Sequence, residues 1–308
     1  MSDSTYILCP GQGAQAVGMG RDFHDAHPAA RAVYEHANDL LGVDLARLCF
    51  DGPEEQLNQT DVAQPAIFVT SLASHAAAVA AGKLEPDDVA GYAGLSLGEY
   101  TALHLAGVFD FATGLKLVQA RGRYMQEAAT SVASGMVSIM GADEQQVNDL
   151  CEQASHGHIL VPANYNCPGQ IVVSGAQPAC ERIAEIASTH GFRAIPLRVA
   201  GAFHSPLMQP AADRLAEDLA ELAFAAPSKP VWSNVTAEPH GDPASIKQLL
   251  IRQITEPVRW SQTMQKLAGG ESGFAELAPG RVLAGLLKKV DRRAPITSYN
   301  TAEALAHG

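Results

Sequence analysis

The 308-residue sequence predicts an α/β protein, in which a parallel sheet is covered by helices on both faces and a small antiparallel subdomain is inserted. Two observations support this prediction. Before residue 130, short apolar segments alternate with helical patterns, the order that gives a parallel sheet. Between residues 130 and 203 the order becomes β-α-β-β-α-β, as in a ferredoxin-like unit. We therefore expect residues 1–129 and 204–308 to form the large domain and residues 130–203 the small subdomain.

The large domain is expected to begin with a buried strand at residues 6–9, an apolar run that ends in the turn signal Pro10-Gly11-Gln12-Gly13. The alternation then continues in chain order with helices at 29–41 and 66–81, a strand at 89–93, and a helix from Asp110 to about residue 128. Asp110 is expected to cap that last helix, because its carboxylate can accept the free amide hydrogens of the first turn.

The inserted subdomain is expected to hold four strands and two helices. In chain order, strands are expected at 136–140, 159–163, 170–174 and 193–199, and helices at 143–154 and 178–190. The two middle strands are joined by the turn Asn166-Cys167-Pro168-Gly169. The large domain then resumes with helices near 206–222, 243–254 and 259–267 and strands at 231–234 and 274–277.

Composition and charge narrow the range of functions. Hydrophobic residues make up 47% of the chain and charged residues 18%, which is ordinary for a soluble globular enzyme and excludes wholesale disorder. The net charge of −12 argues against nucleic acid and anionic membranes as partners. The five cysteines are scattered without a Cys-x-x-Cys pair, and the histidines lack further ligands at metal spacing. We therefore expect reduced thiols and no metal site.

A cytoplasmic protein is expected from the absence of targeting signals. The segment Met1 to Thr5 has no basic stretch followed by an apolar one, so no signal peptide is predicted. No uncharged apolar run reaches the length of a membrane span. The nearest, residues 63–82, is interrupted by Gln64, Pro65 and other polar side chains.

The segment Gly94-Leu95-Ser96-Leu97-Gly98 lies between the expected strand at 89–93 and an apolar helical stretch. Gly-x-Ser-x-Gly between a strand and a helix is typical of a nucleophile elbow. The two glycines remove side chains that would crowd the sharp turn. Ser96 then lies at a helix N-terminus, where free amide N–H groups favour a developing negative charge. The pattern predicts a serine nucleophile.

A serine hydroxyl needs a base within hydrogen-bond reach, and His204 is the best-placed candidate. It follows an expected strand where the inserted subdomain rejoins the large domain, and catalytic groups of α/β proteins gather at such strand ends. A histidine that only packs in the core or lies at the surface is the alternative. Because no Asp or Glu stands out as a third member, a backbone carbonyl can orient the imidazole.

Arg121 is the second informative residue. Its neighbours three and four positions away on the expected helix are all largely apolar: Leu117, Val118, Tyr124 and Met125. A guanidinium on such a stripe is costly to bury unless an anion pairs with it. An internal salt bridge and a bidentate clamp for a substrate carboxylate are both open at this point.

Glu99 and the turn that contains Gln12 could each have either a structural or a functional role. Glu99 begins the helix after the elbow, and helix capping is its expected role. The turn that contains Gln12 can present a backbone N–H to an oxyanion, or it can simply be a tight turn.

Six ordered segments together resemble the malonyl-CoA:acyl carrier protein transacylase family, the acyltransferases of fatty acid and polyketide synthesis. The resemblance covers nearly the whole chain, from Cys9 to about Val290. In chain order the segments are Pro10-Gly11-Gln12-Gly13, the elbow from Gly94 to Tyr100, Gln119-Ala120-Arg121-Gly122, the loop from Asn164 to Gln170, Gly201-Ala202-Phe203-His204-Ser205, and the stretch from Gln253 to Trp260.

The resemblance implies a ping-pong acyl transfer without a bound cofactor or metal. Ser96 would be acylated by malonyl-CoA and would pass the malonyl group to the phosphopantetheine thiol of acyl carrier protein. His204 would act as general base and acid. The backbone N–H groups of Gln12 and Leu97 would form the oxyanion hole, and Arg121 would bind the malonyl carboxylate.

The resemblance also implies supporting residues and one departure. The backbone carbonyl of Gln253 would orient His204, and Asn166 would lie near the mouth of the site. Phe203 resembles members that take malonyl, since those that take methylmalonyl tend to carry a smaller residue there. Many members have histidine where this chain has Leu95. The leucine removes a polar neighbour of the nucleophile. We expect this change to affect hydrolysis of the acyl-enzyme and hydration of the pocket, but not to abolish acyl transfer.

The resemblance implies an α/β-hydrolase-like large domain and a stand-alone malonyl transferase. Within the same chemistry, the alternatives are a discrete acyltransferase that serves a polyketide synthase in trans and a hydrolase that edits acyl-enzymes. A non-enzymatic binding module is disfavoured because Ser96, His204 and Arg121 are intact. An ordinary esterase is disfavoured because its catalytic residues run Ser, Asp or Glu, His, and it has no use for Arg121.

Overall fold

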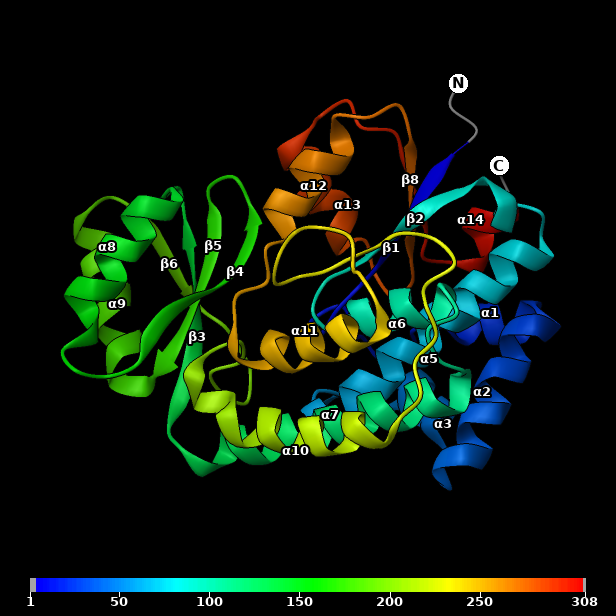
Figure 1. Cartoon of the computed structure of the whole chain (residues 1–308), viewed down its shortest axis with the longest axis horizontal. Helices are drawn as coiled ribbons and strands as arrows, with labels where there is room; N and C mark the ends of the chain where they lie inside the picture. Colours follow the sequence, from blue (N-terminus) through cyan, green and yellow to red (C-terminus); the bar gives the residue numbers. More distant parts are fainter. Residues whose placement is uncertain (1–3, 307–308) are drawn as a thin grey trace.

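The computed structural model describes residues 4–306, which form two sheets with their covering helices (Figure 1). The first three residues, on which the expectation of no signal peptide partly rests, lie outside the described residues. The larger sheet is parallel throughout, in the order β7-β2-β1-β8-β9. Its strands are β1 (Thr5–Cys9), β2 (Val89–Gly94), β7 (Val231–Trp232), β8 (Gly273–Leu277) and β9 (Ile296–Tyr299). The expected α/β class is confirmed.

Helices cover both faces of the parallel sheet, as expected. They include α5 (Thr60–Ala80), α6 (Gly98–Leu105) and α7 (Phe111–Ser131) on one face and α12 (Trp260–Ala268) and α13 (Val282–Val290) on the other. Successive side chains of a strand point to opposite faces. In the central strand β1, Ile7 and Cys9 therefore pack in the core shared with α5 and α7, whereas Tyr6 and Leu8 pack against α12 and α13.

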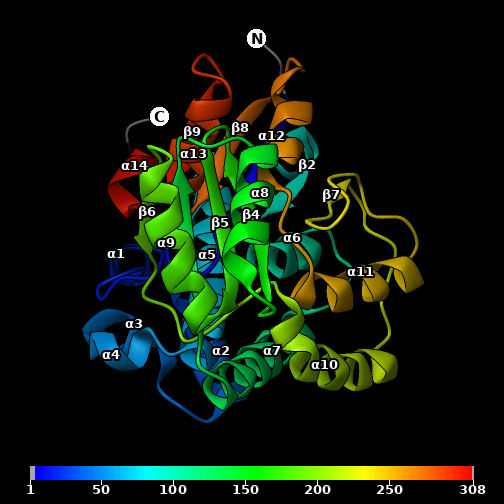
Figure 2. The same ribbon diagram turned by 90° about the vertical axis from the view of Figure 1, so that its left-hand side faces the viewer.

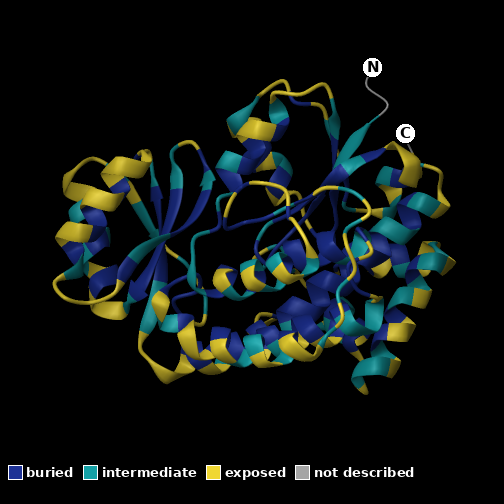
Figure 3. Ribbon diagram, viewed as in Figure 1, coloured by how far each residue is buried: buried dark blue, intermediate teal, exposed yellow. Residues whose placement is uncertain are grey.

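The remaining helices of this part surround that core. They are α1 (Arg21–Ala26), α2 (Pro28–Leu41), α3 (Leu45–Asp51), α4 (Glu54–Leu57), the 3₁₀ turns Pro86–Asp88 and Pro206–Met208, α10 (Gln209–Glu221), α11 (Pro243–Thr255) and α14 (Ala302–Ala306). Buried residues concentrate in α5 and in the strands (Figure 3). By length and composition α5 could cross a membrane, but 78% of its most apolar window is buried inside the protein. Packing in the core accounts for its apolar composition.

The smaller sheet is antiparallel, in the order β4-β5-β3-β6. Its elements are β3 (Ser134–Met140), α8 (Glu144–Ser155), β4 (Leu160–Cys167), β5 (Gln170–Ala176), α9 (Gln177–Thr189) and β6 (Arg193–Pro196). This order confirms the expected ferredoxin-like unit. Helices α8 and α9 cover one face, as Figure 2 shows, and pack on Ile139 and Val173. Met136 and Val172, on the other face, pack with the core of the large part. The domain limits at residues 130 and 203 stay a prediction.

Two strand ends in the smaller sheet differ from expectation by three or more residues, whereas β3 begins and β5 ends within two residues of the expected positions. The strand expected at 159–163 continues to Cys167. It does so because Tyr165 N–H donates to the carbonyl of Val258 (2.9 Å) and Val258 N–H donates to that of Ala163 (2.8 Å). The strand expected at 193–199 ends earlier. Its last ladder bond joins Leu197 N–H to the Met136 carbonyl (2.9 Å), after which the chain turns toward His204.

Other elements also begin or end elsewhere than expected. Helix α5 begins at Thr60 rather than near 66, because the Gln126 side chain accepts the Thr60 N–H at 3.0 Å. Strand β7 ends at Trp232, since Ser233 enters a turn in which its N–H donates to the carbonyl of Glu238 (2.9 Å). Strand β9, helix α13 and the short helices α1, α3, α4 and α14 were not predicted. The segments of β9 and of the four short helices are brief and partly polar.

Candidate active site

Ser96 lies at a sharp turn between β2 and α6, with a backbone φ of +53°. This left-handed conformation costs a non-glycine residue about 1–3 kcal/mol. A Cβ on Gly94 would lie 1.9 Å from the carbonyl carbon of Gly98, and one on Gly98 would lie 2.0 Å from the carbonyl oxygen of Cys9, so both positions require glycine. The Asn234 side chain holds the turn: it donates to the Gly94 carbonyl (2.7 Å) and accepts the Ser96 N–H (2.6 Å).

The structure brings His204 to the serine. His204 Nε2 lies 2.8 Å from Ser96 Oγ, and Nδ1 lies 2.7 Å from the backbone carbonyl of Gln253. A carbonyl only accepts, so Nδ1 carries the proton and Nε2 is free to accept from the serine hydroxyl. His204 also has a positive φ, +56°. Strained backbone at both residues is typical of functional sites.

The protonation of His204 suits a general base. Burial lowers the pKa of His204 from 6.5 to about 4; the positive charge of Arg121 adds to the decrease, and the Gln253 carbonyl opposes it. Since the imidazole is buried and its pKa lies below neutral pH, it is neutral at pH 7 and ready to accept a proton.

This pKa gives a testable pH dependence. Ser96 reacts only while His204 is neutral, so we expect its reactivity to fall as the pH drops toward about 4 and not near 6.5. The rate of inactivation by the uncharged reagent phenylmethylsulfonyl fluoride measures this directly. Replacing Arg121 with alanine removes a positive neighbour, and the apparent pKa should then rise. A wild-type profile centred near pH 6.5 would contradict the assignment.

Arg121 reaches the same point from α7. Its side chain is 1% exposed and donates to Gln64 Oε1 (2.8 Å), Ser96 Oγ (3.1 Å) and Gln253 Oε1 (2.9 Å). The guanidinium carbon also lies 5.1 Å from the centre of the Tyr100 ring. Within residues 4–306 it forms no ion pair with a carboxylate. The internal salt bridge left open by the sequence is therefore not found, and an anion can still bind here.

These three groups meet in a cavity of about 330 Å³ between the two sheets. Of the residues singled out in the sequence, those that line it are Ser96, His204, Arg121, Gln12, Leu95, Asn166 and Phe203. Gln253 lies behind the cavity and reaches it through hydrogen bonds. Leu97 is fully buried beneath the elbow. The antiparallel sheet contributes further wall residues that were not predicted, among them Met136, Asn164 and Val172.

The two amides expected to bind an oxyanion come from neighbouring segments. Leu95 N–H donates to the carbonyl of Cys9 (3.1 Å), which holds the turn at Gln12 beside the elbow. In the described part of the chain, neither Gln12 N–H nor Leu97 N–H donates to a protein acceptor. Both donors are therefore available to a ligand.

Glu99 corrects the sequence prediction. It was expected to cap α6, but no side-chain cap is formed there. The carboxylate is instead fully buried and contacts Asn234, His240 and Gln253, which lie far away in the sequence. Sequence reasoning missed this group because no local pattern links its members. Gln64, which accepts a hydrogen bond from Arg121, could have been identified from the sequence as a functional candidate, because it is a polar residue within an apolar run.

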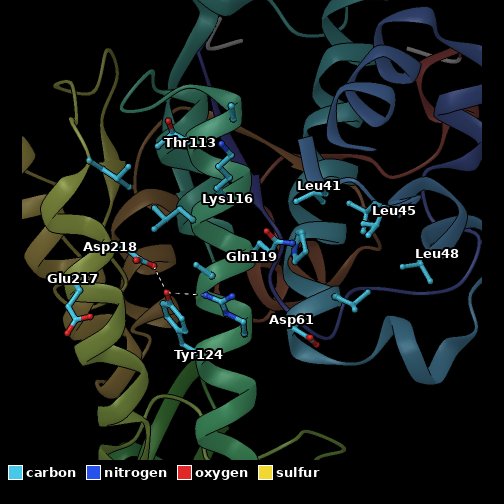
Figure 4. A pocket seen from close by; sticks show the side chains of 18 of the residues that line it. Leu41, Leu45, Leu48, Asp61, Thr113, Lys116, Gln119, Tyr124, Glu217 and Asp218 are labelled. Atoms are coloured by element: carbon cyan, nitrogen blue, oxygen red, sulfur yellow. Dashed lines mark hydrogen bonds between the residues drawn. The ribbon is translucent and has the colours of Figure 1, made fainter. Parts of the chain in front are cut away.

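A larger cavity of about 1120 Å³ lies on the other side of α7 (Figure 4). Its labelled wall residues include Leu41, Lys116 and Tyr124, and neither the serine nor the candidate base lines it. Among the polar groups there, Tyr124 Oη donates to Asp218 Oδ2 at 2.7 Å and accepts from Arg123 at 3.3 Å. The chemistry therefore belongs to the smaller cavity.

Metal ligation was also considered. Among residues 4–306, no group of three or more His, Cys, Asp or Glu side chains is arranged to hold a metal ion. The five cysteines are buried and unpaired, as the scattered spacing predicted.

Comparison with known proteins shows the family of the chain. Residues 5–305 match the acyl transferase domain family. The malonyl CoA-acyl carrier protein transacylase of Bacillus subtilis strain 168 is 40% identical over 302 residues, which cover 97% of this chain and 94% of that protein. The solved malonyl CoA-acyl carrier protein transacylase of Coxiella burnetii is similar with a TM-score of 0.94 at 37% identity, covering 98% of this chain and 96% of that one.

A second similar structure contains a partner. It is a malonyl transacylase in complex with a type II polyketide synthase acyl carrier protein, and it has a TM-score of 0.94 at 37% identity, covering 98% of each chain. The chain therefore belongs to the acyl transferase family, and within it to the malonyl CoA-acyl carrier protein transacylases.

Proposed function

We propose that this protein transfers a malonyl group from malonyl-CoA to the phosphopantetheine thiol of an acyl carrier protein, through an ester on Ser96. One observation carries the proposal: a nucleophile, a neutral base and a buried guanidinium that pairs with no carboxylate of residues 4–306 meet in one cavity. The similar proteins named above are malonyl transacylases, and one is bound to a carrier protein.

In the first half-reaction, Ser96 Oγ attacks the thioester carbonyl of malonyl-CoA while its proton moves to His204 Nε2. The Nδ1–H bond to the Gln253 carbonyl holds the imidazole in the required tautomer. The carbon–sulfur bond then breaks, and His204 returns the proton to the departing CoA sulfur. The product is malonyl-Ser96.

In the second half-reaction the roles are repeated with the carrier thiol. His204 takes the proton of the phosphopantetheine thiol, and the sulfur attacks the malonyl-Ser96 carbonyl. The ester carbon–oxygen bond breaks, and Ser96 Oγ regains its proton from His204. In both tetrahedral intermediates, the amides of Gln12 and Leu97 would donate to the oxyanion, which is a large source of rate enhancement in acyl transfer.

Arg121 selects the acyl group. A planar guanidinium binds a carboxylate with two parallel hydrogen bonds, so the malonyl carboxylate would replace the contact with Ser96 Oγ and release the serine for attack. An acyl group without a carboxylate leaves the buried charge unpaired, which disfavours it. Phe203 and Asn166 limit the space beside the acyl group, and Leu95 gives the wall an apolar surface.

The proposal also covers the biosynthetic pathway that the protein serves and its location in the cell. Fatty acid synthesis is the expected pathway, because the curated relative named above carries the malonyl CoA-acyl carrier protein transacylase name. Service to a polyketide synthase and hydrolysis of the acyl-enzyme are the alternatives. A cytoplasmic location and a small subdomain of residues 130–203 remain part of the same proposal.

Two-substrate kinetics test the proposal. Initial rates measured against malonyl-CoA at several carrier concentrations are expected to give parallel double-reciprocal lines, since CoA leaves before the carrier reacts. Converging lines would show that both substrates must bind together, which excludes the ester on Ser96 as an obligatory intermediate.

A further inference from the structure

The carboxylate of Glu99 is the centre of a hydrogen-bond group behind the catalytic residues. Its side chain and that of His240 are both fully buried. Oε1 lies 2.6 Å from His240 Nε2, and Oε2 accepts from Asn234 N–H (3.1 Å) and from Gln253 Nε2 (2.6 Å). A buried carboxylate is retained only when it is well paired. The Glu99 carboxylate meets this condition, because three partners from two distant segments of the chain form hydrogen bonds with it.

The Gln253 side chain is held in one orientation by this arrangement. Its Nε2 donates to two groups that only accept, the Glu99 carboxylate and the Ser96 carbonyl (3.0 Å). Its Oε1 must then face the other way, where Arg121, which only donates, lies at 2.9 Å. A flipped amide would place donor against donor at the guanidinium. Gln253 is thus a neutral spacer between a negative and a positive buried group.

The charges of the two outer groups interact across this spacer. Burial lowers the pKa of Arg121, and Tyr100 and the Glu99 carboxylate oppose that decrease. Arg121 therefore has a nearby negative charge that makes its burial less costly. Glu99 does not contact the guanidinium, because the Gln253 amide separates them. A carboxylate in direct contact would occupy the fork that a substrate carboxylate needs.

We propose that the order Glu99, Gln253, Arg121 keeps the buried guanidinium open to a substrate carboxylate, and that this open guanidinium gives selectivity for acyl groups that carry a carboxylate. Glu99 is a positioning residue: it balances the charge of Arg121 and fixes the Gln253 amide, while it stays out of contact with the guanidinium. This inference rests on the proposed role of Arg121.

The same group also supports the nucleophile. Asn234, whose N–H donates to Glu99, uses its side chain to bridge Gly94 and Ser96 across the elbow. The loop that carries Asn234 and His240 contains Ala237 with a φ of +52°. A general loss of activity in a Glu99 variant would therefore not distinguish selectivity from support of the elbow. The test has to compare two substrates in the same variant.

The first test exchanges the two side chains, in the variant Glu99→Gln with Gln253→Glu. The net charge is unchanged, but a carboxylate now contacts Arg121 directly. We expect the ratio of kcat/KM for malonyl-CoA to that for acetyl-CoA to fall about 100-fold, because the guanidinium is occupied. Losses common to both substrates cancel in this ratio. A ratio within threefold of wild type would overturn the proposal.

A second variant, Glu99→Gln alone, guards against failure of the exchange to fold. In the described part of the chain His240 Nδ1 has no hydrogen-bond partner, so the imidazole can move its proton to Nδ1 and accept the new amide hydrogen at Nε2. With the negative charge removed and the guanidinium still open, the malonyl to acetyl ratio should stay at wild-type level or rise about threefold. The unfolding temperature of the free protein should drop, because Arg121 has lost its counter-charge. A tenfold fall in the ratio would show that an open guanidinium is not sufficient for the selectivity and would refute the inference.

Arg121→Ala in the same assay separates this inference from the one on which it rests. If Arg121→Ala keeps the wild-type ratio, the proposed role of Arg121 fails, and the inference fails with it. If Arg121→Ala lowers the ratio but the exchange of residues 99 and 253 does not, the role of Arg121 stands and the inference alone is wrong.

Discussion

Replacing His204 with alanine is expected to lower the rate of malonyl transfer by about 10⁴-fold or more. His204 Nε2 is the only imidazole nitrogen that contacts Ser96 Oγ in the described residues, at 2.8 Å. Without it, the hydroxyl has no base for the attack, and neither CoA nor the ester oxygen has an acid to protonate it on leaving. The malonyl-Ser96 ester should not accumulate, which can be checked by rapid-quench measurement of acylation.

A matched control is His190→Ala. His190 is exposed at the end of α9 and contacts only backbone and side-chain groups of its own helix, so its loss should leave the transfer rate within twofold of wild type. If His204→Ala retained a tenth or more of the wild-type rate, another group would have to be the base.

Replacing Arg121 with alanine is expected to have the second-largest effect, and an unequal one. The kcat/KM for malonyl-CoA should fall about 100-fold, which corresponds to about 3 kcal/mol of lost charge-assisted hydrogen bonding. Activity toward acetyl-CoA should be kept or increase, because an unsubstituted acyl group no longer leaves a buried cation unpaired. Steady-state rates with both thioesters and the same carrier protein measure the difference.

Arg121→Lys is the matched control for charge. Lysine keeps the positive charge but cannot form two parallel bonds to a carboxylate, so its malonyl activity should lie between wild type and the alanine variant. Equal losses with malonyl-CoA and acetyl-CoA in the alanine variant would mean that Arg121 supports the structure through Gln64 and Gln253 and does not select the substrate.

The parts of the fold that the sequence predicted are those whose signals are local. Buried runs such as the one at Ile7 and Leu8 are apolar on both faces of the strand, and glycine at position 94 is required by a clash with Gly98, four residues further on. Arg121 was noticed because its helix neighbours are apolar. Each of these features can be read from one segment of the chain.

The parts that were missed depend on contacts between distant segments. The role of Glu99 depends on Asn234, His240 and Gln253, which are more than 130 positions away, so position in a helix suggested only a cap. The extension of β4 depends in the same way on Val258. Such contacts are fixed by the packing of the two sheets, and no periodicity in the sequence records them.

The central claim is that Ser96 carries the malonyl group between two thiols. Its most direct test is the intact mass of the protein after incubation with malonyl-CoA, followed by addition of carrier protein with its phosphopantetheine arm. We predict a mass increase of one malonyl group, absent from Ser96→Ala, that disappears as malonyl-carrier protein forms in equal amount. No adduct on the wild-type protein, or an adduct that is lost to water as fast without the carrier as with it, would contradict the account.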